Sequence, residues 1–276
     1  MPVRASLVAL ALATLVLGVS PAAQAAPHRV FAPYSGAENQ ISSNWAGYVA
    51  TGTNASGAPV SYTDVTSSWV QPKVSCARGE AYSAFWVGLG GFASTSTALE
   101  QIGTESNCDQ LGRPVYDAWY EIVPAPSIPI RMKILPGDQI SAAVLVQGTQ
   151  VTLQITNLTR RSRVTRRVTV ASPDLTSAEW IAEAPSECFE SGRCDTLPLA
   201  DFGSVAFLRV AATGDGAAGT LTNPTWSVTP IELSEQELGG PNQLLPQPTG
   251  TPSGAVPSAL SADGRSFSVA WHPATA

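Results

Sequence analysis

The chain has 276 residues, of which 13% are charged, against roughly 25% in an average soluble domain. Its formal net charge of −6 argues against nucleic acid and anionic membranes as partners, since both carry negative charge themselves. Because few carboxylates are present to be protonated, acid changes the net charge little, and the composition is compatible with work at low pH.

Residues 1–25 predict a secretory signal peptide. Arg4 supplies a positive start, the apolar run "ASLVALALATLVLGV" follows, and "AQA" ends at Ala25 as a small-residue cleavage site. The apolar run is too short to be a convincing membrane span. We therefore expect a secreted, extracellular protein with no membrane partner. Residues 26–40 are expected to be a flexible N-terminal segment or a short propeptide.

From Ile41 onward, short β-like runs alternate with turn residues. The runs are rich in Val, Ile, Thr, Tyr and Trp, and the gaps hold Gly, Pro, Asn and Asp. This pattern predicts one all-β domain over residues 41–276, an antiparallel sandwich or barrel. The arginine-rich run at residues 160–167, "RRSRVTRR", is expected to be a solvated strand face. A Pro/Gly-rich loop is expected near 238–258, and a final strand near 265–271 should return to the same domain.

The cysteines suit an oxidising compartment and predict disulfides. Cys188 and Cys194 enclose only "FESGR", so a local bridge between them is expected, which leaves Cys76 to pair with Cys108. The spacing favours this pairing among the three that four cysteines allow. No CxxC motif or cysteine–histidine cluster is present, so no metal site is expected.

The possible catalytic mechanisms can be reduced by excluding those that need a histidine within the body of the fold. The histidines, His28 and His272, lie near the two ends of the mature chain, so a Ser-His-Asp triad or a Cys-His pair is not expected. Carboxylates remain for proton transfer, helped by amides and tyrosines. The residues imply no cofactor.

Candidate carboxylates lie in two aromatic-rich strands. Asp117 and Glu121 share a face of "YDAWYE", and Glu179 and Glu183 share a face of "AEWIAE". Acids on a face that also carries large apolar groups are costly to bury unless they are paired or functional. The plain alternative is a solvent-facing strand that carries two acids.

Several stretches occur in a characteristic order between about Ser43 and Trp271. They are "SNWAGY", "FWVGLGG", "ALEQIG", "YDAWYE", "LPGD", "AEWIAE" and, after the second cysteine loop, "LPLADF". Together they resemble the glutamic peptidases, the eqolisin family. The resemblance implies a jelly-roll or concanavalin-like β-sandwich of two packed seven-stranded antiparallel sheets. It also implies an endopeptidase that acts in acid on polypeptide substrates, through a Gln/Glu dyad and without a cofactor.

The resemblance assigns roles to particular residues. Gln101 and Glu183 become the catalytic dyad, and the substrate-binding residues are Trp45, Trp86, Asp117 and Glu121. Glu183 would take a proton from water and later give it to the departing amine, while the Gln101 amide would position the water and stabilise the oxyanion. A glutamate with its ordinary pKa of about 4.3 is partly ionised in mild acid, so such a base could work at roughly pH 3 to 5 without a strongly shifted pKa.

One position departs from the family pattern. Fungal relatives typically carry Asp two residues after "WVG", where this chain has Gly90, so the hydrogen bonds that support the dyad are expected to differ. Trp119 and Trp180 lie mid-strand among apolar neighbours and are expected in the core.

Other functions stay open at this level. A sandwich with exposed tryptophans is also compatible with a non-catalytic carbohydrate-binding protein. A glycoside hydrolase that uses Glu121 and Glu183 is a further alternative. Gln101 discriminates between them, because the peptidase needs it and a two-carboxylate glycosidase does not. In each case we expect a monomer.

Overall fold

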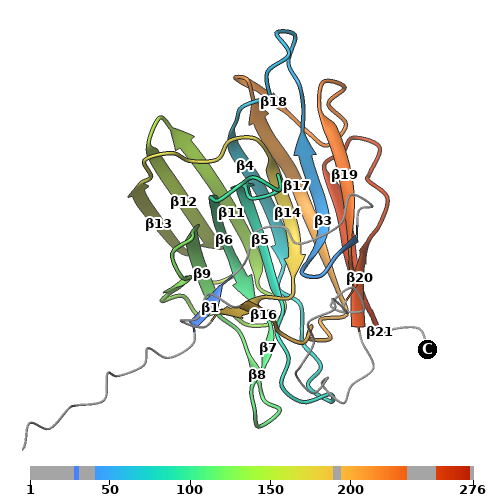
Figure 1. The fold of residues 1–276 in the computed structure, drawn as a ribbon. Coiled ribbons are helices and arrows are strands. Elements are labelled where there is room, and N and C mark those ends of the chain that lie inside the picture. Colours follow the sequence, from blue (N-terminus) through green and yellow to red (C-terminus); the bar gives the residue numbers. More distant parts are fainter. Residues whose placement is uncertain (1–27, 31–40, 189–193, 235–252, 274–276) are drawn as a thin grey trace, which may run out of the picture.

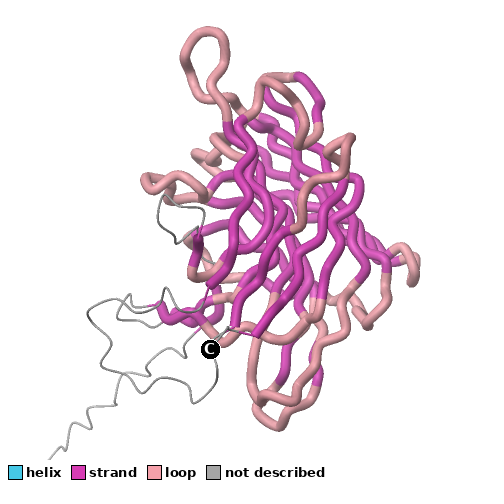
Figure 2. Tube along the Cα trace, turned by 90° about the vertical axis from the view of Figure 1, so that its right-hand side faces the viewer, coloured by secondary structure: helices cyan, strands magenta, loops and turns pink. Residues whose placement is uncertain are grey.

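The computed structural model describes residues 28–30, 41–188, 194–234 and 253–273. The described residues form strands joined by turns and loops, with no helix among them (Figures 1 and 2). No helix in these ranges is therefore long and apolar enough to cross a membrane. The predicted signal peptide lies outside the described residues, as do most of residues 26–40 and of the loop predicted at 238–258. The all-β prediction is confirmed.

The strands form two layers that pack face to face (Figure 1). In hydrogen-bonding order, the front layer contains β10 (Ile128–Ile130), β9 (Ala118–Val123), β6 (Leu99–Glu105), β5 (Ala84–Gly90), β14 (Ala178–Glu183), β3 (Trp45–Thr51) and β19 (Ser227–Ser234). The back layer contains β20 (Ser253–Pro257), β21 (Ser266–Pro273), β17 (Ser204–Gly214), β4 (Tyr62–Val70), β11 (Gln139–Gln147), β12 (Gln150–Asn157) and β13 (Ser162–Thr169).

Short strands complete the fold. β2 (Ile41–Ser42) pairs with β19, and β18 (Ala217–Gly219) pairs with β17. Two small sheets lie beside the sandwich: β1 (His28–Val30) with β15 (Ser186–Cys188) and β16 (Cys194–Thr196), and β7 (Asn107–Cys108) with β8 (Pro114–Val115).

The two layers are not separate sheets. Ile231 of β19 pairs with β3 in the front layer, and Leu233 and Ser234 pair with β20 in the back layer. The hydrogen bonding thus runs through one continuous 16-stranded sheet that folds over at β19. The expectation of two packed seven-stranded sheets is corrected only in the sheet count, because a single strand, β19, contributes to both layers.

The Pro/Gly-rich stretch is shorter than its composition predicts. Its last residues, Ser253–Pro257, form β20, which pairs with both β19 and β21. Backbone pairing on both sides decides the structure here, although "SGAVP" has a loop-like composition. The strand that follows, β21, spans Ser266–Pro273 and joins the back layer of the same sandwich.

In the back layer, buried and partly exposed residues alternate along the strands, as in a sheet that has one face in solvent. In β11 the residues Ile140, Ala142, Val144 and Val146 are buried toward the front layer, and the residues between them are partly exposed. β5, β6 and β14, in contrast, are buried along their whole length, on both faces. The outer face of the front layer is therefore not an ordinary solvent face.

Both expected disulfides are present. Cys76–Cys108 joins the loop after β4 to β7, with the two Cα atoms 5.4 Å apart. Cys188–Cys194 links β15 to β16 across six residues. The second bridge lies a few residues beyond the carboxyl end of β14.

Candidate active site

Neighbouring strands of the front layer bring amide and carboxyl side chains onto one face. Glu121 of β9 lies opposite Gln101 of β6, Gln101 lies opposite Gly88 of β5, and Gly88 lies opposite Glu179 of β14. Residues that are directly opposite in antiparallel strands point to the same side. Glu121, Gln101 and Glu179 therefore share the outer face, and the Gln101 Nε2 donates to Glu121 Oε2 over 2.8 Å.

Glu183 lies on the same face at the end of β14, opposite Ala84 of β5 and Trp45 of β3. The side chain is buried and accepts hydrogen bonds from neighbouring side chains. Trp86 Nε1 donates to its Oε2 over 2.8 Å, and Asn44 Nδ2 donates to its Oε1 over 3.5 Å. Neither the sequence pattern nor the resemblance assigned a role to Asn44, although it stands directly before Trp45 in "SNWAGY".

The surroundings of Glu183 shift the pKa of its carboxyl group. Burial raises its pKa well above the ordinary value, and the nearby negative charge of Glu121 raises it further. The hydrogen bonds from Trp86, Asn44 and Trp45 favour the ionised form and oppose this shift only in part. Catalysis in mild acid required no strong pKa shift at Glu183; the structure raises this pKa because the strand-end carboxyl group is fully buried.

Glu121 interacts with both Gln101 and Glu183. It accepts a hydrogen bond from Gln101, and its charge acts on Glu183. Two neighbouring carboxyl groups share one negative charge more readily than they carry two, because the second ionisation works against their repulsion. This arrangement can hold one proton next to an amide group that is held in a fixed orientation.

Aromatic side chains surround the carboxyl groups. Trp45 and Trp86 contact each other edge to face, with ring centroids 5.0 Å apart. Trp119 belongs to the same outer-face cluster, whereas Trp180 packs between the layers, where its Nε1 donates to Thr66 O over 2.9 Å. Trp180 therefore occupies the core position expected for it. Trp119 instead lies on the outer face, on the side of Glu121, as the alternation of "YDAWYE" indicates.

Asp117 lies apart from the other predicted residues. It is exposed, precedes β9, and its backbone carbonyl accepts from the Glu105 N–H over 2.8 Å. Four residues of extended chain separate it from Glu121, a distance of about 13 Å. The structure thus brings together Gln101, Glu121, Glu183 and the tryptophans, and leaves Asp117 at one end of the same face.

Comparisons with known proteins identify the family. Residues 43–238 match the model of the Peptidase A4 family. The chain belongs to this family, the eqolisins. It is 34% identical to Aspergillopepsin-2 of Aspergillus niger over 203 residues, which cover 64% of this chain and 67% of that protein. It is 29% identical to Scytalidopepsin B of Scytalidium lignicola over 208 residues, which cover 73% and 74%.

Solved structures give the same result. The scytalido-glutamic peptidase with a transition state analog inhibitor superposes with a TM-score of 0.63 at 25% identity, covering 83% of this chain and 98% of that one. Aspergilloglutamic peptidase from Aspergillus niger superposes with a TM-score of 0.51 at 28% identity, covering 70% and 99%. The chain is thus a glutamic endopeptidase.

In this A4 peptidase, a side chain from another loop fills the space beside Gly90. Gly90 has a left-handed φ of 82°, and a Cβ added there would lie 2.5 Å from the Cβ of Asp174. Asp174, in the loop before β14, therefore occupies the room that a side chain at position 90 would need. Its Oδ2 accepts from the Gly91 N–H over 3.3 Å. Sequence reasoning missed Asp174, because only the fold brings the two loops together.

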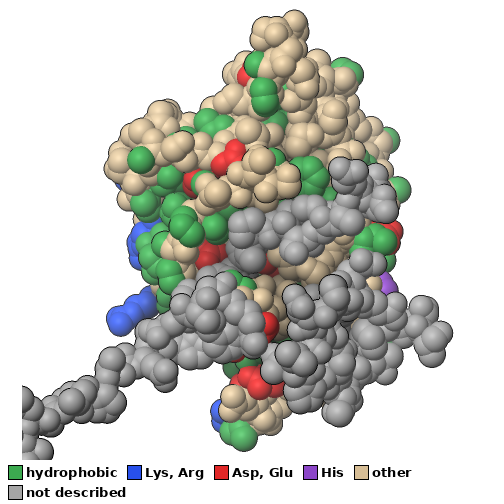
Figure 3. Space-filling model, in the orientation of Figure 1, with side chains coloured by type: hydrophobic (Ala, Val, Ile, Leu, Met, Phe, Trp, Pro, Cys, Tyr) green, Lys and Arg blue, Asp and Glu red, His purple; other side chains and the backbone are tan. Residues whose placement is uncertain are grey.

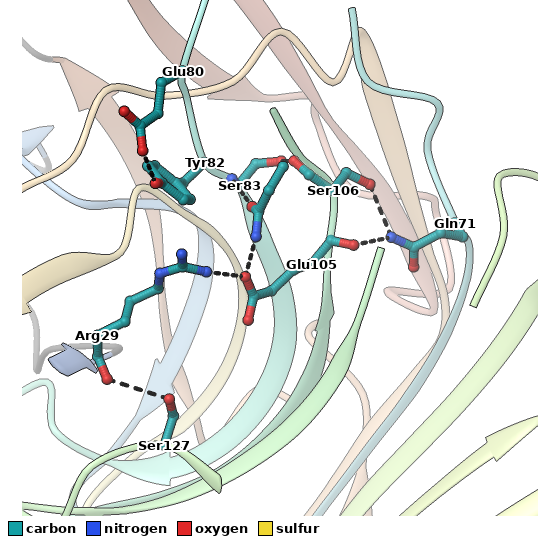
Figure 4. A network of polar contacts seen from close by, with 9 residues as sticks. Arg29, Gln71, Glu80, Tyr82, Ser83, Glu105, Ser106 and Ser127 are labelled. Atoms are coloured by element: carbon teal, nitrogen blue, oxygen red, sulfur yellow. Dashed lines mark hydrogen bonds and ion pairs between the residues drawn. The ribbon is translucent and has the colours of Figure 1, made fainter. Parts of the chain in front are cut away.

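A second polar network lies at the Glu183 end of the same face (Figure 4). Glu105 of β6 and Glu183 of β14 are both opposite Ala84 of β5. The Arg29 guanidinium lies 2.6 Å from Glu105 Oε2 and 4.2 Å from the centre of the Tyr82 ring. Burial raises the pKa of Glu105, and Arg29 opposes that shift. This ion pair fastens β1, a short strand of the predicted N-terminal segment, beside the active-site face.

Proposed function

We propose that this glutamic endopeptidase is secreted, acts in acid, and uses Glu183 and Gln101 as its catalytic pair. The observation that carries the proposal is the hydrogen-bonded and charge-coupled group of Gln101, Glu121 and Glu183 on one tryptophan-lined face. Residues 1–25 would be removed on export, and the mature enzyme is expected to act as a monomer.

Glu183 serves as the general base and then as the general acid. In its ionised form it takes a proton from the attacking water, and it later transfers that proton to the departing amine nitrogen. Its raised pKa suits the first step, because a more basic carboxylate accepts the proton more readily. A hydrogen bond from Trp86 Nε1 fixes the orientation of the carboxylate.

Gln101 stabilises the oxyanion. One N–H of its amide is held by Glu121, so the orientation of the amide is fixed before substrate binds. The second N–H of the same nitrogen is then directed at the carbonyl oxygen of the scissile bond. One such donor contributes on the order of 3 kcal/mol to stabilising the transition state.

Acid action follows from the proton that Glu121 and Glu183 hold between them. The active form carries one negative charge on the pair. At higher pH both groups ionise, and the repulsion between two negative charges within a buried site disfavours the correct geometry. Trp45 and Trp86 supply the apolar wall of the substrate cleft, and Asp117 is a further predicted substrate contact at its end.

The test is a pH profile of the purified mature enzyme on a denatured protein substrate. Cleavage is expected in acid and should fall toward alkaline pH, as the shared proton is lost. Undiminished cleavage at pH 8 would overturn the acid mechanism. An absence of cleavage at every pH, together with binding to a polysaccharide, would replace the proposal with the sugar-binding alternative.

Trp86→Phe will lower kcat/KM at pH 4 by roughly tenfold, because the charge-assisted hydrogen bond to Glu183 is lost while the ring remains. Without that donor, the pKa of Glu183 rises further, so the acid limb of the pH profile will move to higher pH. Steady-state kinetics between pH 3 and pH 7 measure both effects.

Trp271→Phe is the matched control for this substitution. Trp271 lies on β21, in the back layer, and its replacement should leave the pH profile unchanged. A Trp86→Phe enzyme with a normal acid limb would show that the indole N–H does not act on the catalytic base.

A further inference from the structure

Basic side chains are concentrated in one part of the chain. Residues 128–169, from β10 to the end of β13, contain seven basic residues and one acidic residue, which gives this segment a net charge of +6. Because the whole chain carries −6, the other residues together carry −12. Charges are screened over about 8 Å in physiological salt, so an anion near this segment responds to the local positive charge more than to distant acids.

The structure places this charge along one side of the sandwich. β10 and β13 are the two end strands of the hydrogen-bonding path. β12 packs against β6, so both end strands lie on the same side of the molecule. In Figure 1, β13 is the outermost strand on the left, and Figure 3, in the same orientation, shows Lys and Arg side chains on that side. The basic segment therefore forms a continuous positive margin.

Two arginines of β13 stand on the solvent face of the back layer. Thr156 of β12 lies opposite Arg163, and Thr152 lies opposite Arg167, so these four side chains point to the same side. The Arg163 Nε donates to Thr156 Oγ1 over 3.3 Å. The two arginines are four residues apart, about 13 Å along the strand, and Thr165 lies between them on the same face.

Carboxyl groups are distant from these arginines on this face. All residues of β11 and β12 are uncharged. The first acid across the sheet is Asp64 of β4, which lies opposite Leu145 of β11, which in turn lies opposite Thr152. Asp64 is thus three strands from Arg167, about 14 Å away. Burial also raises the pKa of Asp64, which reduces its negative charge in acid.

Most hydrogen-bond donors of the basic margin have no acidic partner within the protein. In the described part of the chain, Arg160 forms an ion pair with Asp138, whose Oδ2 lies 2.6 Å from its Nε. The other ion pairs there involve arginines outside this segment. Arg166 Nη1 donates only to a backbone carbonyl, that of Thr165, over 3.3 Å. Since each guanidinium carries five N–H donors, most of them are available to a ligand from outside.

The chemistry of this face favours a phosphate ester. The planar guanidinium group binds two oxygens of a phosphate at once. In the acid range proposed for the enzyme, a phosphate ester keeps a negative charge, whereas carboxylates with a pKa near 4 are largely protonated. The Thr and Gln side chains of β12 add hydroxyl and amide groups, which pair with sugar hydroxyls. A flat row of such groups between separated charges fits an extended chain of sugars.

We propose that the solvent face of β12 and β13 binds a linear polysaccharide that carries phosphate esters. Arg163 and Arg167 contact the phosphates, and the Thr and Gln side chains of β12 contact the sugars. The proposed catalytic residues Gln101 and Glu183 lie on the outer face of the opposite layer, so the bound polymer leaves them open to substrate. This surface would hold the secreted enzyme on material that is coated with such a polymer.

The experiment measures the Kd of the purified mature protein for phosphorylated dextran at about pH 4.5, beside carboxymethyl dextran and unmodified dextran of the same length. Phosphorylated dextran is expected to bind at least roughly tenfold more tightly than either, and added salt should weaken its binding. The double variant Arg163→Gln/Arg167→Gln should lose about tenfold in affinity and keep the wild-type kcat/KM for a peptide. Arg113→Gln/Arg265→Gln removes two exposed arginines elsewhere and should keep the wild-type Kd.

A second double variant, Arg163→Lys/Arg167→Lys, guards against a folding defect in the glutamine variant. It keeps both charges but loses the bidentate geometry, so its affinity should lie between those of wild type and the glutamine variant. Equal binding of the three dextrans to wild type, or wild-type affinity in the glutamine variant, would overturn the surface. Tighter binding of single-stranded DNA or of dextran sulfate, at matched charge density, would overturn the phosphorylated polysaccharide as the partner.

Discussion

Replacing Glu183 by glutamine is expected to lower kcat for peptide hydrolysis by about a hundredfold to ten-thousandfold, the range of a single general acid–base group. The glutamine side chain has nearly the same shape and can keep one hydrogen-bond acceptor toward Trp86 Nε1, but it cannot take a proton from water. KM should change little, because the loss concerns the transition state. Single-turnover and steady-state assays at pH 4 measure the effect.

Glu179→Gln is the matched control, since Glu179 lies on the same face of the same strand and is equally buried. Its carboxyl oxygens have no hydrogen-bond partner, and burial raises its pKa well above the ordinary value, so it is already neutral in acid. Activity within a few-fold of wild type is expected. If Glu179→Gln were inactive and Glu183→Gln active, the base would have to be reassigned to Glu179.

The free energy of unfolding is expected to fall as pH rises from about 4.5 to about 8, which makes this an acid-stable fold. Glu100 is fully buried, neither of its carboxyl oxygens has a hydrogen-bond partner, and burial raises its pKa to about 8, with Asp174 adding to the shift. In this window the folded state keeps a proton that the unfolded state has lost, so stability decreases with pH. The contribution of Glu100 to this decrease is on the order of 4 kcal/mol.

Urea unfolding at pH 4.5, 6 and 8 tests this directly, with the variant Glu100→Gln beside wild type. The variant cannot ionise, so its stability should depend less on pH, whatever its absolute value at pH 4.5. Glu187→Gln, on β15, serves as the control and should keep the wild-type slope. Equal slopes in wild type and Glu100→Gln would mean that Glu100 ionises in the folded state without cost.

The sequence predicts the fold class well because strand periodicity is a local property. Alternating Val, Ile and Trp, with Gly and Pro between the runs, is sufficient to indicate an antiparallel sandwich or barrel, and the family resemblance selects the sandwich. The crossover at β19 is a different case, because its pairing with β3 and then with β20 depends on partners far away in the chain. The strand at Ser253–Pro257 escapes prediction for the same reason.

The residues of the candidate site can be predicted where they belong to sequence motifs. Gln101, Glu121 and Glu183 come from recognisable motifs, but their common face depends on the register between separate strands, which the structure supplies. Burial, however, is a tertiary property, so the raised pKa of Glu183 is not visible in "AEWIAE". Asp174 fills the space at Gly90 from a loop more than 80 residues away, which no local pattern encodes.

The continuous sheet has consequences for aggregation. Its hydrogen-bonding path ends at β10 on one side and at β13 on the other, and an unpaired edge invites strand addition by another molecule. β10 is three residues long, whereas β13 is longer and exposes Arg163, Arg166 and Arg167. In acid, carboxylates lose their charge while guanidinium groups keep theirs. The longer edge therefore stays positively charged and repels its counterpart under the conditions in which the protein as a whole loses its negative charge.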